Sequence, residues 1–138
     1  MQARVKWVEN MAFVAESDSG HAVVMDGPQE LGGRNLGPRP MEMLLMSIGA
    51  CSSVDVVMIL KKARQNITDC WCELSAKRAD SDPKVFTEIH LQFVVTGKEL
   101  GESHVKRAVE LSAEKYCSAS IMAARGGCKV THGYEIRG

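Results

Sequence analysis

Apolar and polar residues alternate through the first 26 positions in three short runs separated by turn-forming residues. The runs are Val5 to Val8, Phe13 to Ala15 and Val23 to Met25, and Glu9-Asn10 supplies the first turn. Short alternating runs bounded by turns are typical of antiparallel strands, so we predict a three-stranded meander. Residues 26–40 contain four glycines and three prolines, which indicates a loop.

A long apolar helix is predicted for residues 41–64. Pro40 suits a helix start, and Glu42 lies in the first turn, where the helix dipole favours negative charge. Asp55 is the only charged residue between positions 43 and 60. A helix that is apolar on nearly every face is a buried helix. We therefore place it at the centre of the fold, against its own copy.

The rest of the chain predicts a β-hairpin, two helices and a final strand. These elements cover residues 69–78, 85–96, 101–116, 118–124 and 128–136. The predicted order is βββ-α-ββ-αα-β, which is an α+β fold. A chain of 138 residues is about one domain, so we expect a single domain over residues 1–138.

Charge and hydropathy exclude two classes of partner. Seventeen basic and seventeen acidic residues cancel, so no basic excess is available to hold a nucleic-acid backbone. The N-terminus MQARVKWVEN has no apolar segment of the signal-peptide kind. The most hydrophobic stretch, residues 43–54, is shorter than a bilayer span. We expect a cytoplasmic protein that binds neither nucleic acid nor membrane.

Five cysteines are an odd number for a disulfide framework, and in a reducing cytoplasm they begin as thiols. We expect at least three to be small buried hydrophobic residues. Cys70 and Cys72 flank one residue of a predicted strand, so both face the same side of the sheet. This spacing lacks a second ligand pair, and the four histidines stand alone, so we predict no metal site and no cofactor.

Cys117 lies at the break between the last two predicted helices. The short helix beginning near Ser118 would direct free backbone N–H groups and a partial positive charge at its sulfur. A helix N-terminus lowers a thiol pKa, so Cys117 is a candidate reactive cysteine. The alternative is a cysteine that merely caps the helix.

Cys51 lies midway along the apolar helix, in the segment GACSSVD. Shielding from water raises a thiol pKa and makes the thiol inert, so reactivity would need a cationic neighbour. Arg34 and Arg39, in the preceding loop, are the candidates, and Asp55 would oppose ionisation if it faced the same way. The alternative is an ordinary core cysteine.

Two segments carry a family resemblance. PMEMLLMSIGACSSVDVV places a proline eleven residues before Cys51, and LSAEKYCSAS places Cys117 after a helix end. These segments, with an element order that spans nearly the whole chain, resemble the OsmC/Ohr superfamily (osmotically inducible protein C and organic hydroperoxide resistance protein). They look closest to its YhfA-like branch.

The resemblance implies an intertwined homodimer, with the two long helices packed together between antiparallel sheets and two equivalent sites at the subunit interface. It also implies that Cys51 is the peroxidatic thiol and Cys117 the resolving thiol. Peroxidase members of the family carry a glutamate directly after the proline, where it holds an active-site arginine. Here Met41 occupies that position and Glu42 follows it.

The predicted catalytic set is Cys51, Cys117, Arg39 and Glu42. Nine residues of regular helix turn through about 900°, which puts Glu42 and Cys51 on opposite faces. The second cysteine is usually followed by proline in the peroxidase members, and here Ser118 follows it.

We expect thiol-dependent reduction of organic hydroperoxides. The Cys51 thiolate would be oxidised to sulfenic acid, Cys117 would close a disulfide, and an external dithiol such as a lipoyl group would reduce it. An apolar pocket would favour organic over inorganic peroxide. The alternative, motivated by Met41, is a non-catalytic dimer that binds a small apolar ligand or senses redox state. Thiol acyl transfer is a third possibility, but no histidine base is near Cys51 in the sequence.

Overall fold

A computed structural model describes every residue from Met1 to Gly138. The chain forms two compact units, Met1–Leu45 and Met46–Gly138. The prediction of one domain over 1–138 stays a prediction. In chain order the elements are β1 (Ala3–Glu9), β2 (Ala12–Ser17), β3 (Ala22–Asp26), η1 (Gln29–Leu31), α1 (Pro40–Lys62), β4 (Asn66–Arg78), β5 (Phe86–Lys98), α2 (Glu102–Leu111), η2 (Ser112–Tyr116), α3 (Ser118–Arg125) and β6 (Lys129–Arg137).

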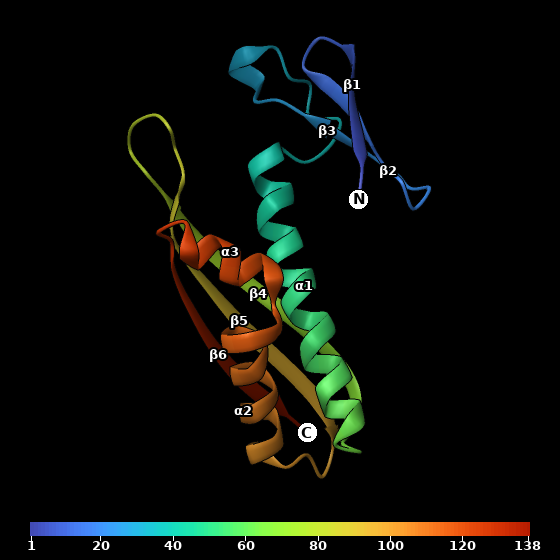
Figure 1. The fold of residues 1–138 in the computed structure, drawn as a ribbon, viewed down its shortest axis with the longest axis vertical. Coiled ribbons are helices and arrows are strands. Elements are labelled where there is room, and N and C mark those ends of the chain that lie inside the picture. Colours follow the sequence, from blue (N-terminus) through green and yellow to red (C-terminus); the bar gives the residue numbers. More distant parts are fainter. The chain divides into compact units, whose positions relative to one another are not determined.

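The predicted α+β order of elements is confirmed, with two sheets of three strands. In the first unit β1, β2 and β3 form an antiparallel meander, as the alternating pattern predicts (Figure 1). Trp7 pairs with Phe13, which pairs with Met25. Because side chains alternate along a strand, these three lie on one face of the sheet. The same face carries Val5, Ala15 and Val23.

In the second unit β4, β5 and β6 form a sheet whose one face is covered by helices (Figure 1). β5 lies in the middle of the sheet, and its alternate side chains are part of the core. They are Ile89, Leu91, Phe93 and Val95, each at most 1% exposed. The predicted hairpin is confirmed as the antiparallel pair of β4 and β5.

One pairing differs from the expected antiparallel arrangement, because β6 lies parallel to β5. The chain leaves β5, passes through α2, η2 and α3, and returns to start β6 beside the start of β5. Parallel neighbours need a long crossover of this kind, which usually contains helix. The last strand therefore follows the crossover rather than a hairpin turn.

Helix α1 begins as predicted. Pro40 is its first residue, and the carboxylate of Glu42 accepts the backbone N–H of Arg39 at 2.8 Å. A glutamate at the third helical position that reaches back to the residue before the helix satisfies a donor that would otherwise be free. Glu42 thus caps the start of α1 and also places a negative charge where the helix dipole favours it.

One face of α1 is buried, whereas burial was predicted for nearly every face. The buried residues are Ile48, Gly49, Ser52, Val56 and Leu60. In a single chain Leu44, Met46, Val54 and Met58 are more than 40% exposed.

The hydropathy of α1 corrects one statement from the sequence. Its 23 residues include an 18-residue window of mean hydropathy 2.0, long and apolar enough to cross a membrane by length and composition. The core helix of a soluble protein passes the same test. Gly49 packs closely against Leu74 of β4, as expected of the core helix of a soluble protein.

Candidate functional site

Cys51 and Cys117 lie in the second unit, on different elements. Cys51 is in the middle of α1, and Cys117 lies between η2 and α3. η2 is a π-helical turn that ends α2, and its last bond runs from the Cys117 N–H to the Ser112 carbonyl at 2.9 Å. π-Turns occur often at functional sites. This turn stops the helix one residue before Cys117 and lets α3 begin after it.

The sulfur of Cys117 is the N-cap of α3, as the sequence predicts. It accepts the backbone N–H of Ser120 at 3.4 Å, and the side chain is fully buried. Burial raises the pKa of this thiol, but hydrogen bonds from Ser120, Ser52 and Cys51 outweigh it and leave the pKa below its ordinary value. Cys117 is therefore the acidic thiol of the site.

The Ser52 side chain adds to this arrangement from α1. Its hydroxyl is buried and has no hydrogen-bond partner, and its nearness to the sulfur lowers the pKa of Cys117. A buried hydroxyl without a partner costs free energy, so an ionised sulfur beside it satisfies both groups. The carbonyl of Ile48 lies 4.0 Å from the same sulfur.

The Cys51 thiol is half-buried and has the opposite tendency. The backbone N–H of Ala119 favours its thiolate, but burial, the charge and hydrogen bond of Cys117 and the charge of Asp55 together raise the pKa of Cys51. Asp55 thus opposes ionisation, as the sequence indicates. The contact with Ala119 was not predicted, because it comes from α3, far along the chain.

The two thiols are neighbours, because their interaction lowers the pKa of Cys117 and raises the pKa of Cys51. Two amide groups in the first turn of α3 serve them, that of Ala119 for Cys51 and that of Ser120 for Cys117. One helix N-terminus therefore polarises both sulfurs. Chemically, two neighbouring thiols of unequal acidity can close a disulfide.

Ser112 fixes η2 to α1 beside the two thiols. Its buried hydroxyl lies 3.1 Å from the Asp55 carboxylate and 3.3 Å from the Ser52 carbonyl. A bond to a charged group in a buried setting is among the stronger hydrogen bonds. It holds the turn that carries Cys117 against the helix that carries Cys51.

The remaining cysteines are poor nucleophiles. Cys70 and Cys72 share the helix-facing side of β4, opposite Val95 and Phe93, as the spacing predicts. Burial, followed by the charges of Cys70 and Cys117, raises the pKa of Cys72 to about 12. Burial also raises the pKa of Cys70 and that of Cys128. No three His, Cys, Asp or Glu side chains are grouped so that they could hold a metal ion.

Arg39 and Glu42, the other members of the predicted set, pair with each other in the first unit. The Glu42 carboxylate lies 4.0 Å from the Arg39 Nε, and the same guanidinium donates to Asn35 at 2.7 Å. The resemblance expects a glutamate that holds an arginine, and Glu42 makes such a contact one position after Met41. Their action on Cys51 stays a prediction.

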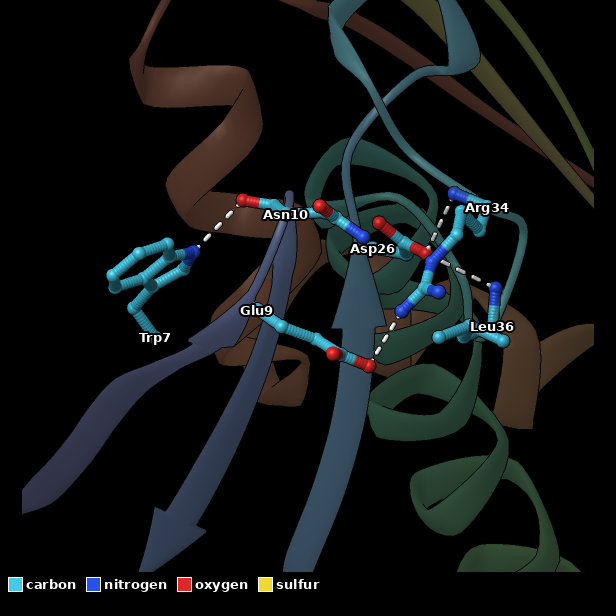
Figure 2. Close-up of polar contacts among 6 residues, drawn as sticks. All are labelled: Trp7, Glu9, Asn10, Asp26, Arg34 and Leu36. Carbon is cyan, nitrogen blue, oxygen red and sulfur yellow. Dashed lines mark hydrogen bonds and ion pairs between the residues drawn. The ribbon is translucent and has the colours of Figure 1, made fainter.

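Arg34, the second candidate arginine, is held by two carboxylates (Figure 2). Its guanidinium pairs with Glu9 at 2.5 Å, and its backbone N–H donates to the buried Asp26 at 3.0 Å. The same Asp26 oxygen accepts the Leu36 N–H at 3.1 Å. Burial opposes ionisation of Asp26, but the bonds from Arg34 and Leu36 leave its pKa below the ordinary value. Asp26 thus organises the loop before α1.

Comparison with known proteins agrees with this architecture. Residues 32–133 match the family described as OsmC-like protein. The chain is 49% identical over 136 residues to protein YhfA of Escherichia coli K12, covering 99% of this chain and 98% of that one. Both Cys51 and Cys117 therefore lie within the residues that match the family.

Solved structures give the same result. A hypothetical protein from Aquifex aeolicus VF5 is 33% identical, with a TM-score of 0.86 over 99% of this chain and 95% of that one. The organic hydroperoxide resistance protein OhrB of Bacillus subtilis shares the fold at 22% identity, with a TM-score of 0.61 over 98% of each chain. The match identifies α1 as the core helix of a soluble fold. By sequence and by fold, this chain belongs to the OsmC-like protein family, as a relative of YhfA.

Proposed function

We propose that this protein is a homodimeric thiol peroxidase that reduces organic hydroperoxides through Cys51 and Cys117. The observation that carries the proposal is the pair of neighbouring thiols at the N-terminus of α3, where Cys117 caps the helix. The fold is shared with organic hydroperoxide resistance proteins, which supports the same substrate class. A thiol pair of unequal acidity suits two successive roles, attack on the peroxide and closure of a disulfide.

Accessibility favours Cys51 for the first role. Cys51 is half-buried, whereas Cys117 is fully buried. The Cys51 sulfur attacks the terminal peroxide oxygen, so an S–O bond forms and the O–O bond breaks. The thiol is oxidised to sulfenic acid, and the peroxide leaves as an alcohol after taking up a proton.

Cys117 takes the second role. Its sulfur attacks the Cys51 sulfur, an S–S bond forms, and the hydroxyl of the sulfenic acid leaves as water with one proton. An external dithiol then restores both thiols and becomes a disulfide itself. A lipoyl-type dithiol in the cytoplasm fits this step. Arg39, held by Glu42, would steady the charge that develops during the attack.

The exposed side of α1 supports the dimer. A groove of 640 Å³ runs along it, lined by Ala50, Ser53, Val54, Val57, Met58, Lys61 and Lys62. Apolar side chains exposed along a whole helix face mark an interaction surface. A second copy that covers this face would also complete an apolar pocket for an organic peroxide.

Peroxide consumption by purified protein tests the proposal. With cumene hydroperoxide and a dithiol, the wild type should turn over, Cys51→Ser should be inactive, and Cys117→Ser should stall after one oxidation. Cys128→Ser is the matched control, because Cys128 is also a buried thiol, and its sulfur donates to the carbonyl of Lys129. Full activity of Cys51→Ser would overturn the proposal.

A ligand-binding dimer is the second candidate, and the raised pKa of Cys51 favours it. A thiol that stays protonated reacts slowly with peroxide. Native mass spectrometry of the purified dimer separates the two functions. A small apolar molecule that co-purifies, in a protein without peroxide turnover, would support binding, and saturating turnover would exclude it.

A further inference from the structure

A side-chain hydrogen bond from Ser112 crosses from η2 to α1 at the level of the two thiols. The Ser112 hydroxyl lies 3.1 Å from a carboxylate oxygen of Asp55 and 3.3 Å from the carbonyl of Ser52. Ser112 is 0% exposed, so water does not compete for its hydroxyl. A hydrogen bond to a carboxylate in such a setting is one of the stronger kind.

Each end of this bond lies one turn from a reactive thiol. On α1, Asp55 follows Cys51 by four residues, so the two share one side of the helix. On η2, the carbonyl of Ser112 accepts the backbone N–H of Cys117 at 2.9 Å, which closes the π-helical turn. The Ser112–Asp55 bond therefore joins the same two elements that carry the thiols.

Two backbone carbonyls of α1 show that these elements meet around Cys51. The Ile48 carbonyl lies 4.0 Å from the Cys117 sulfur, and the Ser52 carbonyl lies 3.3 Å from the Ser112 hydroxyl. Ile48 precedes Cys51 by three residues, and Ser52 follows it directly. The turn that carries Cys117 thus lies along the stretch of α1 that carries Cys51.

Disulfide closure depends on how closely two such elements are held. A disulfide requires Cβ atoms within about 3.5–4.5 Å of each other and a dihedral angle near 90°. A misplacement of about 1 Å between reacting groups is enough to slow a reaction strongly. A buried bond between η2 and α1 is therefore placed where it controls this step.

We propose that Ser112 is a positioning residue, whose bond to Asp55 holds the Cys117 sulfur within reach of Cys51 while the disulfide closes. This inference rests on the proposed function, because disulfide closure is its second step. In that step the Cys117 sulfur attacks the sulfur of the Cys51 sulfenic acid, the S–S bond forms and the S–O bond breaks. The hydroxyl takes up the Cys117 proton and leaves as water. Ser112 forms and breaks no covalent bond here and acts through geometry.

A positioning role differs from an electrostatic role in the step that it affects. The charge of Asp55 disfavours an anion on Cys51, and the hydroxyl that donates to Asp55 weakens that charge. An electrostatic role of Ser112 would therefore act on the first step, in which Cys51 attacks the peroxide. A positioning role acts on the second step, in which Cys117 attacks Cys51.

Single-turnover oxidation with cumene hydroperoxide measures the two steps. Dimedone traps the Cys51 sulfenic acid, and mass spectrometry follows its formation and its conversion to the disulfide. Ser112→Ala should slow the conversion by roughly tenfold, as the loss of one hydrogen bond to a charged group does. It should leave the formation of sulfenic acid unchanged. A slowing confined to the first step, or wild-type rates of both steps, would overturn the inference.

A matched pair of variants at Asp55 tests the bond from its other end. Asp55→Asn and Asp55→Ala both remove the charge, but only asparagine keeps a side-chain oxygen that can accept from Ser112. The disulfide should therefore close faster in Asp55→Asn than in Asp55→Ala. Ser112→Ala should add little further slowing to Asp55→Ala, because the bond is already lost. Equal rates in the asparagine and alanine variants would refute the positioning role.

A control variant separates positioning from a general loss of stability. Val105 is 0% exposed on α2, and Val105→Ala removes buried methyl groups while leaving the Ser112–Asp55 bond in place. Urea denaturation compares its stability with that of Ser112→Ala. Closure at the wild-type rate in Val105→Ala, beside slow closure in Ser112→Ala, supports positioning. Equal slowing in the two variants would reject it.

A redox titration keeps the inference separate from the peroxidase activity. Mixtures of reduced and oxidised dithiothreitol set the disulfide equilibrium without any peroxide. A bond that holds two thiols together raises their effective concentration, so Ser112→Ala should lower the equilibrium constant of the Cys51–Cys117 disulfide by roughly tenfold. A lowered constant in a protein that turns over no peroxide would uphold Ser112 and overturn the peroxidase. An unchanged constant would reject the role of Ser112 and leave the proposed peroxidase standing.

Discussion

The backbone N–H of Ser120 points at the sulfur of Cys117 from 3.4 Å, which makes a thiol the N-cap of α3. Helix caps are usually oxygen atoms of Ser, Thr, Asp or Asn. A neutral sulfur is a weak acceptor, whereas a thiolate is a strong one. The start of α3 and the charge of Cys117 therefore stabilise each other.

The Ser120 side chain gives a first prediction. Burial raises the pKa of Cys117, and the Ser120 hydroxyl is first among the groups that lower it. Ser120→Ala should therefore move the thiolate titration of Cys117 to higher pH, which ultraviolet absorbance in Cys51→Ala protein would measure. Ser118→Ala is the matched control, since Ser118 is exposed in the same turn. Equal midpoints in the two variants would contradict this role for Ser120.

The sequence predicts those parts of the site that depend on local structure. The break after η2 and the short helix that follows place Cys117 at a cap, and a cap is read from neighbouring residues. The start of α1 at Pro40, with Glu42 in its first turn, is local in the same way. Alternation also predicts the shared face of Cys70 and Cys72.

Contacts between distant segments are what the sequence does not reveal. The Ala119 amide reaches Cys51, and the Ser112 hydroxyl reaches Asp55, across more than fifty positions of chain. No periodicity encodes such a pairing, because it depends on how α3 and η2 pack on α1. The parallel pairing of β6 was missed for the same reason, since it follows from the path of the crossover.

Close packing of α1 on β4 gives a second prediction. A Cβ atom added at Gly49 would lie 2.6 Å from Cδ1 of Leu74, so the leucine must move. Overpacking costs about 1–3 kcal/mol, against a helix-propensity gain of about 1 kcal/mol for alanine over glycine. Gly49→Ala should therefore lower the free energy of unfolding by up to about 2 kcal/mol in urea denaturation.

A double-mutant cycle checks that this cost comes from the Leu74 contact. In a Leu74→Ala background the added methyl group has room, so Gly49→Ala should be neutral or stabilising there. The same penalty in both backgrounds would rule out the contact as its cause.

Asp26 gives a third prediction, on stability at low pH. Its folded pKa is lowered, because the bonds from Arg34 and Leu36 outweigh burial. A carboxyl with a depressed folded pKa contributes stability above its ordinary pKa of 3.8, and this contribution is lost as the pH falls toward the folded value. Asp26→Asn should thus be less stable than the wild type near neutral pH, with a difference that shrinks below pH 3.8. Denaturation at several pH values measures it, and a constant difference would refute the linkage.

His132 gives a fourth prediction, on a pH dependence of stability that is set by a basic side chain instead of a carboxyl. Its Nε2 is buried without a hydrogen-bond partner, and burial, followed by the charge of His90, lowers its pKa below 6.5. The unfolded chain binds a proton there at a pH where the folded chain does not. Stability should therefore fall as the pH drops from 6.5 toward the folded pKa.

His132→Leu should remove this part of the pH dependence, because neither state then gains a proton at position 132. His21→Leu is the control, since His21 is exposed in the turn before β3. Urea denaturation between pH 8 and pH 5 should give a smaller slope for His132→Leu than for the control. Equal slopes would mean that His132 is protonated in the folded protein as readily as in the unfolded chain.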